Sequence, residues 1–183
     1  MKSPAKLKTI LFAVSGSIAA YRVCDVISEL RKAGHTVLCL MTEGAKQFIT
    51  PLTLKTLSGN PVYSDPFDHP SLSQPVHTSL ADRADVMVFA PATADLIARL
   101  AHGLANDLVT DVALATKAPK LLVPAMNDNM YSNPFTQENL GRLKKAGFHI
   151  LPPIKGDLAC GRVGVGHIPE ADHILDALQK FLK

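Results

Sequence analysis

Apolar runs alternate along the chain with segments in which apolar residues recur every three or four positions. The runs are short and rich in Val, Ile and Leu, so they predict buried strands at residues 8–14, 35–41, 85–90, 120–123 and 149–151. The periodic segments predict helices at residues 19–30, 95–102, 107–115, 134–146 and 169–182. Two shorter helices are predicted at residues 51–59 and 77–83, and a loop rich in Pro, Ser and Asp at residues 60–74.

Strands that are apolar throughout and alternate with helices indicate a parallel sheet covered on both faces. The predicted fold class is therefore α/β, a three-layer Rossmann-like (flavodoxin-like) architecture. The 183 residues suit one domain with a single well-formed core. In such sheets ligands bind outside the carboxyl ends of the strands, so those ends are where a site is expected.

The residues that follow four of the predicted strands are small or carry hydroxyl or amide groups. The segments, in chain order, are SGSI, MTEG, APATAD and PAMNDN. Small residues permit close approach of a ligand, and hydroxyls and amides supply hydrogen bonds. The sequence therefore predicts one ligand site to which four strand ends contribute.

The first of these turns favours a phosphate group. Gly16, Ser17 and Ile18 bring the N-terminus of a helix, with free N–H groups and a positive dipole end, to a strand end. The chain has neither GxGxxG here nor GxxxxGK[ST] elsewhere, so a mononucleotide fits better than a dinucleotide, with Thr42 as a second hydroxyl donor. A helix cap at Ser17 and a plain turn at Gly16 explain the same residues.

The end of the third predicted strand suits a flat ring system. Pro91, Ala92 and Ala94 keep bulk away from the backbone, and Thr93 supplies a hydroxyl. A strand-to-helix turn capped by Thr93 or Asp95 explains this stretch almost as well. The motif therefore needs support from the rest of the chain.

Composition and charge narrow the class of protein. Hydrophobic residues make up 47% of the chain, the net charge is +3, and no apolar run approaches the ~20 residues of a membrane span. The lysines follow helix faces without interleaved aromatic residues, so neither nucleic acid nor a membrane is an expected partner. The basic N-terminus is unlike a cleavable signal, which predicts a cytoplasmic protein. Cys24, Cys39 and Cys160 are too scattered for a disulfide framework or a metal site.

Four segments together resemble the flavin-dependent cysteine decarboxylase family. They are SGSIAA, APATADLIARLAHGLANDL, PAMNDNMYSNP and LACGRVGVGHIPE, within about residues 8–170. The third is similar to the family signature Pro-x-Met-Asn-x-x-Met-Trp, with Tyr131 in place of Trp. The fourth resembles the mobile substrate flap, expected here at about residues 155–169, with His167 and Ile168 where Arg and Met are frequent.

The resemblance implies that the bound mononucleotide is FMN. Its phosphate is expected near Gly16, Ser17, Ile18 and Thr42. Its ring is expected against Thr93, Ala94, Asp95, Leu96 and Ala125. Residues 1–183 are then a single FMN-binding decarboxylase domain, whose part is to place the cofactor and to shape its electrostatic surroundings.

The family reaction that the resemblance implies is decarboxylation of a C-terminal cysteine moiety. Oxidation of the thiol side gives a thioaldehyde, which takes up the electrons left behind when carbon dioxide departs. By resemblance, Cys160 is the acid that protonates the resulting enethiol, which permits a redox-neutral carboxy-lyase reaction from 4′-phosphopantothenoylcysteine to 4′-phosphopantetheine in coenzyme A biosynthesis. An incidental thiol in a glycine-rich surface loop is the competing interpretation of Cys160.

The same resemblance assigns roles to four further side chains. His77 is the catalytic histidine, and an imidazole suits proton transfer near neutral pH. Asn127 is expected to bind the substrate carboxylate without adding a charge that would retain it. Met130 packs around the sulfur-bearing substrate, and Arg162 is a candidate for its phosphate. Without the resemblance, His77 is interpreted as an ordinary surface or helix-capping residue, and Asn127 is interpreted as a turn residue.

Two other classes of function stay open. A non-catalytic FMN-binding regulatory protein needs none of His77, Asn127 and Cys160. A peptidyl-cysteine decarboxylase tolerates loss of Cys160, and a flavin prenyltransferase needs neither the PAMN signature nor His77. The resemblance also implies a homo-oligomer, either a trimer or a dodecamer assembled from trimers, in which the apolar helices at residues 95–115 are a candidate contact surface. Both a stand-alone enzyme and half of a bifunctional one remain possible.

Overall fold

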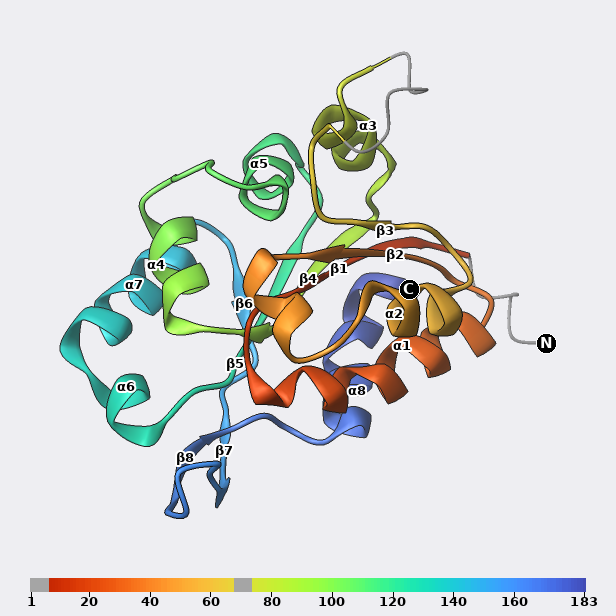
Figure 1. The fold of residues 1–183 in the computed structure, drawn as a ribbon. Helices are drawn as coiled ribbons and strands as arrows, with labels where there is room; N and C mark the ends of the chain where they lie inside the picture. Colours follow the sequence, from red (N-terminus) through yellow and green to blue (C-terminus); the bar gives the residue numbers. More distant parts are fainter. Residues whose placement is uncertain (1–6, 68–73) are drawn as a thin grey trace.

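The computed structural model describes residues 7–67 and 74–183. A parallel sheet lies at the centre of these residues, and helices cover both of its faces (Figure 1). His69 and most of the second half of the predicted loop at residues 60–74 lie outside the described residues, as do the first six residues of the chain. No helix in the described part of the chain has the length and apolar character that a membrane span needs.

The central sheet has six strands in the order β3-β2-β1-β4-β5-β6, all parallel. Their bounds are β1 Thr9–Val14, β2 Thr36–Met41, β3 Val62–Tyr63, β4 Val86–Ala92, β5 Lys120–Pro124 and β6 His149–Ile150. The helices are η1 Ile18–Arg22, α1 Val23–Lys32, η2 Glu43–Gln47, α2 Pro51–Ser58, α3 Val76–Arg83, α4 Ala94–Ala101, α5 Leu108–Ala115, α6 Asp128–Ser132, α7 Pro134–Lys145 and α8 Ala171–Leu182. The predicted three-layer α/β fold is confirmed, with the strand order typical of Rossmann sheets.

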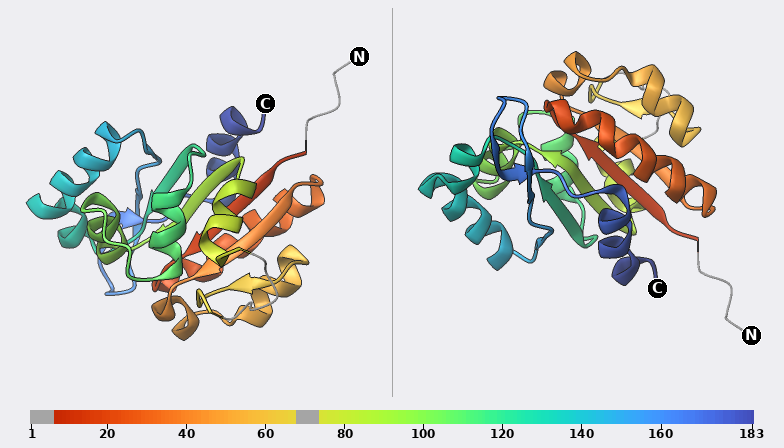
Figure 2. Two further views of the ribbon diagram at one scale, coloured as in Figure 1. Left: turned by 90° about the horizontal axis from the view of Figure 1, so that it is seen from above. Right: turned by 90° about the horizontal axis from the view of Figure 1, so that it is seen from below.

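The alternation of side chains along each strand divides the core into two apolar clusters. In β1, Ile10, Phe12 and Val14 face one side, while Leu11 and Ala13 face the other. The first cluster is covered by α1, α2 and α8, and the second by α3, α4, α5 and α7. Figure 2 shows the two layers from opposite sides of the sheet. Burial on both faces explains why these strands are apolar without a break.

Among the elements that the prediction missed are β3 and α6, which have no periodic pattern of their own. Strand β3 lies inside the predicted loop, and its two residues are too few to show a period. Helix α6 has five residues and none of them is buried, so no apolar stripe marks it. Elsewhere the predicted helix at residues 19–30 is divided into η1 and α1.

The glycine-rich segment of the predicted flap is more regular than a loop. It forms an antiparallel hairpin of β7, Ile154–Asp157, and β8, Val163–His167, which projects below the sheet in Figure 1. Ile168, directly after β8, is 2% exposed and belongs to the first cluster of the core. The replacement of the family's frequent Met by Ile at this position is therefore a change in core packing.

Candidate functional site

The strand order brings together the four strand ends that carry small, hydroxyl or amide residues, at the carboxyl ends of the parallel strands. Strands β2, β1, β4 and β5 are consecutive neighbours, so the segments that follow them meet in the same order. From β1 the chain winds outward through β2 to β3, and from β4 it winds the other way to β6. The edge between β1 and β4 is thus the topological switch point, where open α/β sheets bind their ligands.

A buried hydroxyl joins the two strands at this switch point. Ser15 is 1% exposed, and its Oγ donates a hydrogen bond to the Pro91 carbonyl at 2.7 Å. The same oxygen accepts the Thr93 N–H at 3.0 Å. The sequence analysis did not single out Ser15, although a serine that ends an apolar strand is a signal that could have found it.

Three of the predicted ligand hydroxyls also serve as helix caps. Ser17, Thr42 and Thr93 accept backbone N–H groups of the following helices at 3.2, 3.3 and 3.3 Å. The cap explanation of these residues is therefore realised in the structure. A capping hydroxyl still carries its own proton, so it can donate a hydrogen bond to a ligand as well.

Two glycines bring the turns after β1 and β2 into backbone contact. A Cβ built on Gly16 would lie 2.9 Å from the Gly44 carbonyl carbon, closer than side-chain atoms approach a backbone. Glycine is therefore required at position 16 by close approach, in addition to any turn. The two turns therefore lie against each other at the carboxyl ends of β1 and β2, beside the switch point, where backbone N–H groups free of side-chain bulk suit a mononucleotide phosphate.

The residues predicted to face the flavin ring differ in what they expose. Ala125 is 3% exposed and its N–H donates to the Ala92 carbonyl at 3.1 Å, which holds the ends of β4 and β5 together. The Leu96 side chain is fully buried in the core, so it can offer a ligand only its backbone. The Asp95 side chain is exposed and pairs with Arg99 at 3.0 Å.

Next to the end of β5, the structure brings Asn127 and Cys160 together. The Asn127 Nδ2 donates to the Cys160 Sγ at 3.4 Å, although 33 residues separate them in sequence. The Asn127 Oδ1 also accepts the Asn129 N–H at 3.0 Å, so this amide caps α6 as the turn interpretation required. A backbone bond of 3.1 Å from the Met126 N–H to the Gly166 carbonyl seats the hairpin here.

The surroundings of Cys160 favour its thiolate. The side chain is exposed, and its pKa is lowered by the backbone N–H of Arg162, by the Arg162 guanidinium and by the Asn127 amide. Arg162 in turn forms an ion pair with Asp128, with Nη2 and Oδ1 2.6 Å apart. The other two cysteines differ: burial raises the pKa of Cys39 to about 12, and burial also raises the pKa of Cys24.

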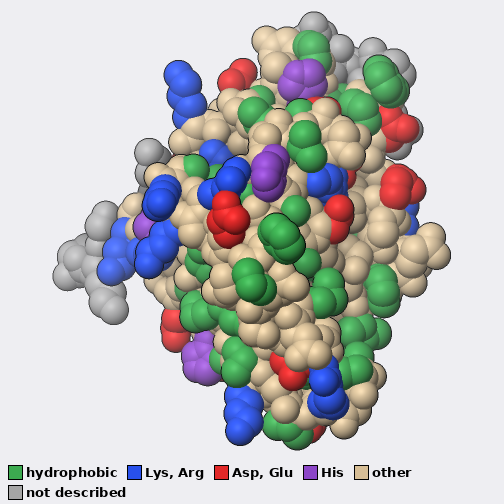
Figure 3. All heavy atoms as spheres, turned by 90° about the vertical axis from the view of Figure 1, so that its left-hand side faces the viewer, with side chains coloured by type: hydrophobic (Ala, Val, Ile, Leu, Met, Phe, Trp, Pro, Cys, Tyr) green, Lys and Arg blue, Asp and Glu red, His purple; other side chains and the backbone are tan. Residues whose placement is uncertain are grey.

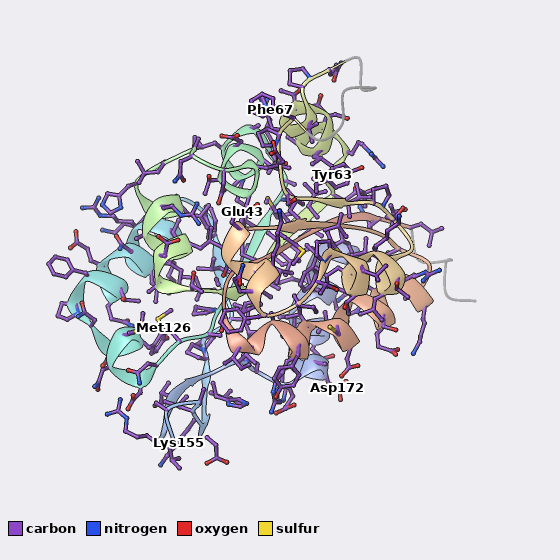
Figure 4. All side chains as sticks on the ribbon, in the orientation of Figure 1. Glu43, Tyr63, Phe67, Met126, Lys155 and Asp172 are labelled. Atoms are coloured by element: carbon purple, nitrogen blue, oxygen red, sulfur yellow. The ribbon has the colours of Figure 1, made fainter. Side chains whose placement is uncertain are left out.

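Two of the side chains labelled in Figure 4, Met126 and Lys155, belong to this corner of the molecule. Met126 lies on the inner side of α6 and packs against the second cluster of the core, whereas Lys155 points outward from the hairpin. Met130 is 49% exposed. Beside it, a hollow of about 480 Å³ is lined by Asp128, Asn129, Tyr131, Ser132, Gln137 and Val165. On the face that carries α6 and α7, acidic and basic side chains are interspersed with hydrophobic ones (Figure 3).

His77 is not part of this cluster within one chain. It lies on α3, which packs against the second cluster of the core together with α5. Helix α3 and the β7–β8 hairpin occupy opposite faces of the sheet (Figure 1). One chain thus assembles two of the three predicted catalytic side chains. Within the described residues, no group of three His, Cys, Asp or Glu side chains is arranged to hold a metal ion.

Comparison with known proteins defines the class to which this fold and edge belong. The model of the flavoprotein family, described simply as "Flavoprotein", matches residues 2–183. The chain belongs to the flavoprotein family, which confirms the resemblance found in the sequence motifs.

Individual relatives carry names that are more specific than the description of the family. The chain is 48% identical over 177 residues to a probable phosphopantothenoylcysteine decarboxylase of Streptococcus mutans, covering 96% of this chain and 99% of that one. It is 46% identical over 169 residues to the coenzyme A biosynthesis bifunctional protein CoaBC of Escherichia coli, covering 92% of this chain. The chain spans only 42% of the length of that bifunctional relative.

Solved structures give the same picture. A PPC decarboxylase mutant complexed with pantothenoylaminoethenethiol matches with a TM-score of 0.88 at 30% identity, over 96% of this chain and 98% of that one. The FMN binding protein AtHal3 matches with a TM-score of 0.85 at 31% identity, over 96% and 97% of the two chains. These neighbours confirm the fold class predicted from the strand pattern.

Proposed function

We propose that this chain is an FMN-dependent carboxy-lyase that converts 4′-phosphopantothenoylcysteine to 4′-phosphopantetheine, a step of coenzyme A biosynthesis. The observation that carries the proposal is the contact of 3.4 Å between the Asn127 amide and the Cys160 thiol. This contact puts a neutral carboxylate-binding group and an acid side by side at the strand edge suited to a mononucleotide. The names of the relatives at 46–48% identity support the same substrate.

When bound, FMN supplies oxidation of the thiol side of the substrate and the later reduction of the decarboxylated product. The chain supplies placement and proton transfer. The phosphate is expected at the turns of Gly16 and Gly44, and Ser17, Thr42 and Thr93 offer hydroxyl donors to the cofactor. Thr93, Ala94, Asp95, Leu96 and Ala125 form the proposed floor for the ring, with Leu96 contributing backbone alone.

Asn127 and Cys160 act on the substrate itself. The Asn127 Nδ2 donates a hydrogen bond to the carboxylate, and because the amide is neutral it does not retain the charge as carbon dioxide leaves. The Cys160 thiol then protonates the enethiol, and its thiolate is stabilised by the N–H and guanidinium of Arg162. Met130 packs against the sulfur end of the substrate.

The proposed role of His77 requires a second copy of the chain. Because α3 and the hairpin lie on opposite faces of one chain, His77 would complete the site of a neighbouring subunit. We therefore propose a homotrimer, or a dodecamer assembled from four trimers, whose sites lie between subunits. We also propose that residues 1–183 are one FMN-binding domain with residues 155–169 as its substrate flap, and that the protein is cytoplasmic.

The direct test incubates the purified yellow protein with phosphopantothenoylcysteine and follows carbon dioxide and the product by mass spectrometry. The saturated thiol is expected from the wild type. With Cys160→Ser, carbon dioxide and the unreduced enethiol are expected, because the acid is missing. With His77→Asn, turnover is expected to cease while the flavin stays bound.

The alternatives give different outcomes in the same assay. A peptidyl-cysteine decarboxylase would act on peptides that end in cysteine and release the enethiol from the wild type. A flavin prenyltransferase would release no carbon dioxide from either substrate. A regulatory protein would hold FMN and turn over nothing, and a preparation that cannot be loaded with flavin would end the enzyme proposal.

A further inference from the structure

Asp128 contacts the hairpin at two points and stands directly beside Asn127. Its Oδ1 lies 2.6 Å from the Arg162 Nη2, and 27% of its side chain is exposed. Its Cβ lies 2.7 Å from where a Cβ on Gly164 would be, so the hairpin backbone rests on this side chain. The two contacts lie on either side of Val163. Together they fix the position of β8 and the direction of the Arg162 side chain.

The Arg162 side chain needs such an anchor. It is 49% exposed, and a long exposed side chain without a partner samples many rotamers. Its guanidinium favours the Cys160 thiolate only while it stays close, because the attraction between exposed charges decays within about a Debye length of 8–10 Å. The groups that lower the thiol pKa most are Arg162 and Asn127, so Asp128 is expected to act on the thiol chiefly through Arg162.

The other titratable groups of the β7–β8 hairpin and of α6 do not take the place of the Asp128–Arg162 pair. On the hairpin these groups are Lys155, Asp157 and His167. On α6 the titratable residue besides Asp128 is Tyr131. The His167 Nδ1 is paired with the Asp157 carbonyl at 2.9 Å across the hairpin. None of these groups is among the main causes of the lowered Cys160 pKa.

We propose that Asp128 is a positioning residue for the protonation step: by its ion pair it holds the Arg162 guanidinium beside Cys160 and so sets the reactivity of that thiol. The inference rests on the proposed function. In the step concerned, the Cys160 Sγ–H bond breaks and its proton passes to the carbon of the enethiolate that lost carbon dioxide. The C=C pair forms the new C–H bond and a sulfur lone pair forms C=S, which gives the thioaldehyde that FMN would reduce when bound. The thiolate left on Cys160 is stabilised by Arg162 and Asn127, and solvent returns a proton to the exposed sulfur.

This assignment changes the role expected for Arg162. The substrate phosphate lies at the opposite end of the substrate from its cysteine moiety. A guanidinium that serves Cys160 therefore sits at the reacting end, and another group holds the phosphate.

The first experiment measures the pH dependence of Cys160 alkylation by iodoacetamide in the flavin-loaded protein, with Cys160→Ser as the blank for Cys24 and Cys39. Asp128→Asn and Arg162→Gln are each expected to move the profile to higher pH and to slow alkylation at neutral pH about two- to fivefold, as suits exposed charges. In the double variant, Asp128→Asn is expected to add nothing to Arg162→Gln. The control is Glu138→Gln, which breaks the exposed Arg142–Glu138 pair on α7 and should leave the profile unchanged.

The outcomes separate the proposal from its competitors. An unchanged profile in Asp128→Asn would mean that the carboxylate does not position the guanidinium. A profile moved to lower pH would mean that Asp128 competes with the thiolate for Arg162. Additive shifts in the double variant would mean that Asp128 acts independently of Arg162. Each of these results overturns the inference.

The second experiment measures products from phosphopantothenoylcysteine. Asp128→Asn is expected to release carbon dioxide at the wild-type rate but a larger fraction of unreduced enethiol, because only the later proton transfer is slowed. If the wild type releases no carbon dioxide while the alkylation profiles shift as expected, the proposed function fails and the linkage among the three residues stands. If the wild type turns over and Asp128→Asn gives the saturated thiol alone, the positioning role fails.

Discussion

Two regions of the proposed site are built in different ways. The switch-point edge, formed by Ser15, Gly16, Gly44 and Thr93, is made of backbone contacts and one buried hydroxyl. The hairpin edge, formed by Asn127, Asp128, Cys160 and Arg162, is made of side chains that are exposed or half-buried. The first arrangement suits a group that must be held in one place, and the second suits groups that exchange protons with a substrate and solvent.

The largest effect is expected from Gly16→Ala. The added Cβ would meet the Gly44 backbone at 2.9 Å, so the turns after β1 and β2 must separate. We expect the free energy of unfolding to fall by about 2–3 kcal/mol and the purified protein to lose most of its flavin colour. Denaturant unfolding and the visible spectrum measure both. Full flavin occupancy in this variant would show that the contact between the two turns is not needed for binding.

A somewhat smaller loss is expected from Ser15→Ala. The substitution leaves the Thr93 N–H without its buried acceptor, which costs about 1–2 kcal/mol of unfolding free energy. The matched control is Thr56→Ala, whose exposed hydroxyl bonds the Leu52 carbonyl at 2.8 Å. Its effect should lie within about 0.5 kcal/mol. Equal losses in the two variants would show that the buried Ser15 hydroxyl contributes no more to stability than an exposed hydroxyl does.

The hairpin edge should respond in chemistry more than in stability. In Gly164→Ala, the new Cβ displaces the hairpin from Asp128, so we expect a loss below about 1 kcal/mol of unfolding free energy. The fraction of unreduced enethiol among the products should nevertheless rise. Val163→Ala, at an exposed neighbouring position, should leave the product ratio unchanged. A stability loss as large as that of Gly16→Ala would remove the contrast between the two edges.

The pH dependence of thiol modification offers a test without any substitution. Because the pKa of Cys160 is lowered and that of Cys24 is raised, Cys160 holds its thiolate to lower pH. As the pH falls, Cys24 should lose reactivity first and Cys160 later. Mass spectrometry of the alkylated peptides between pH 6 and pH 10 gives the pH midpoint of modification for each of the two cysteines. Because midpoints are compared and not absolute rates, the different exposure of the two thiols does not affect the result. Coinciding midpoints would contradict the electrostatic picture of the hairpin edge.

The smallest effect, and one of opposite sign, is expected at a glycine without any close contact. Gly141 lies inside α7 with nothing within 4 Å of an added Cβ, so Gly141→Ala should stabilise the protein by about 0.5–1 kcal/mol. Gly147 also has open space, but its φ of 90° makes Gly147→Ala destabilising. The pair shows, by thermal unfolding, whether space or backbone conformation decides the cost of a glycine substitution.

Much of the fold was predictable because burial on both faces of a sheet forces continuous apolar runs. The predicted strands at residues 8–14, 35–41 and 85–90 match β1, β2 and β4 to within a residue or two. Elements that bury little escaped notice, as β3 and α6 did. The hairpin escaped as well, since its exposed, glycine-rich strands show neither a period nor an apolar run.

The candidate site was predictable in composition but not in arrangement. The motifs named Asn127 and Cys160 by resemblance, yet their contact across 33 residues follows from the docking of the hairpin on the end of β5. Neither Ser15 nor Asp128 was singled out, because a lone serine or aspartate has no meaning until its partners are known. The separation of His77 from the other two side chains was equally invisible.

By itself the sequence determined the parallel α/β sheet and the family, and it predicted the strand ends at which a ligand is expected, because periodicity and short motifs are local properties of the chain. Only the tertiary structure decided that Gly16 meets Gly44, that Ser15 bridges β1 and β4, that Asn127 contacts Cys160 and that Arg162 pairs with Asp128. These are contacts between distant segments. Their geometry depends on how the layers pack, and packing is a property of the whole folded chain.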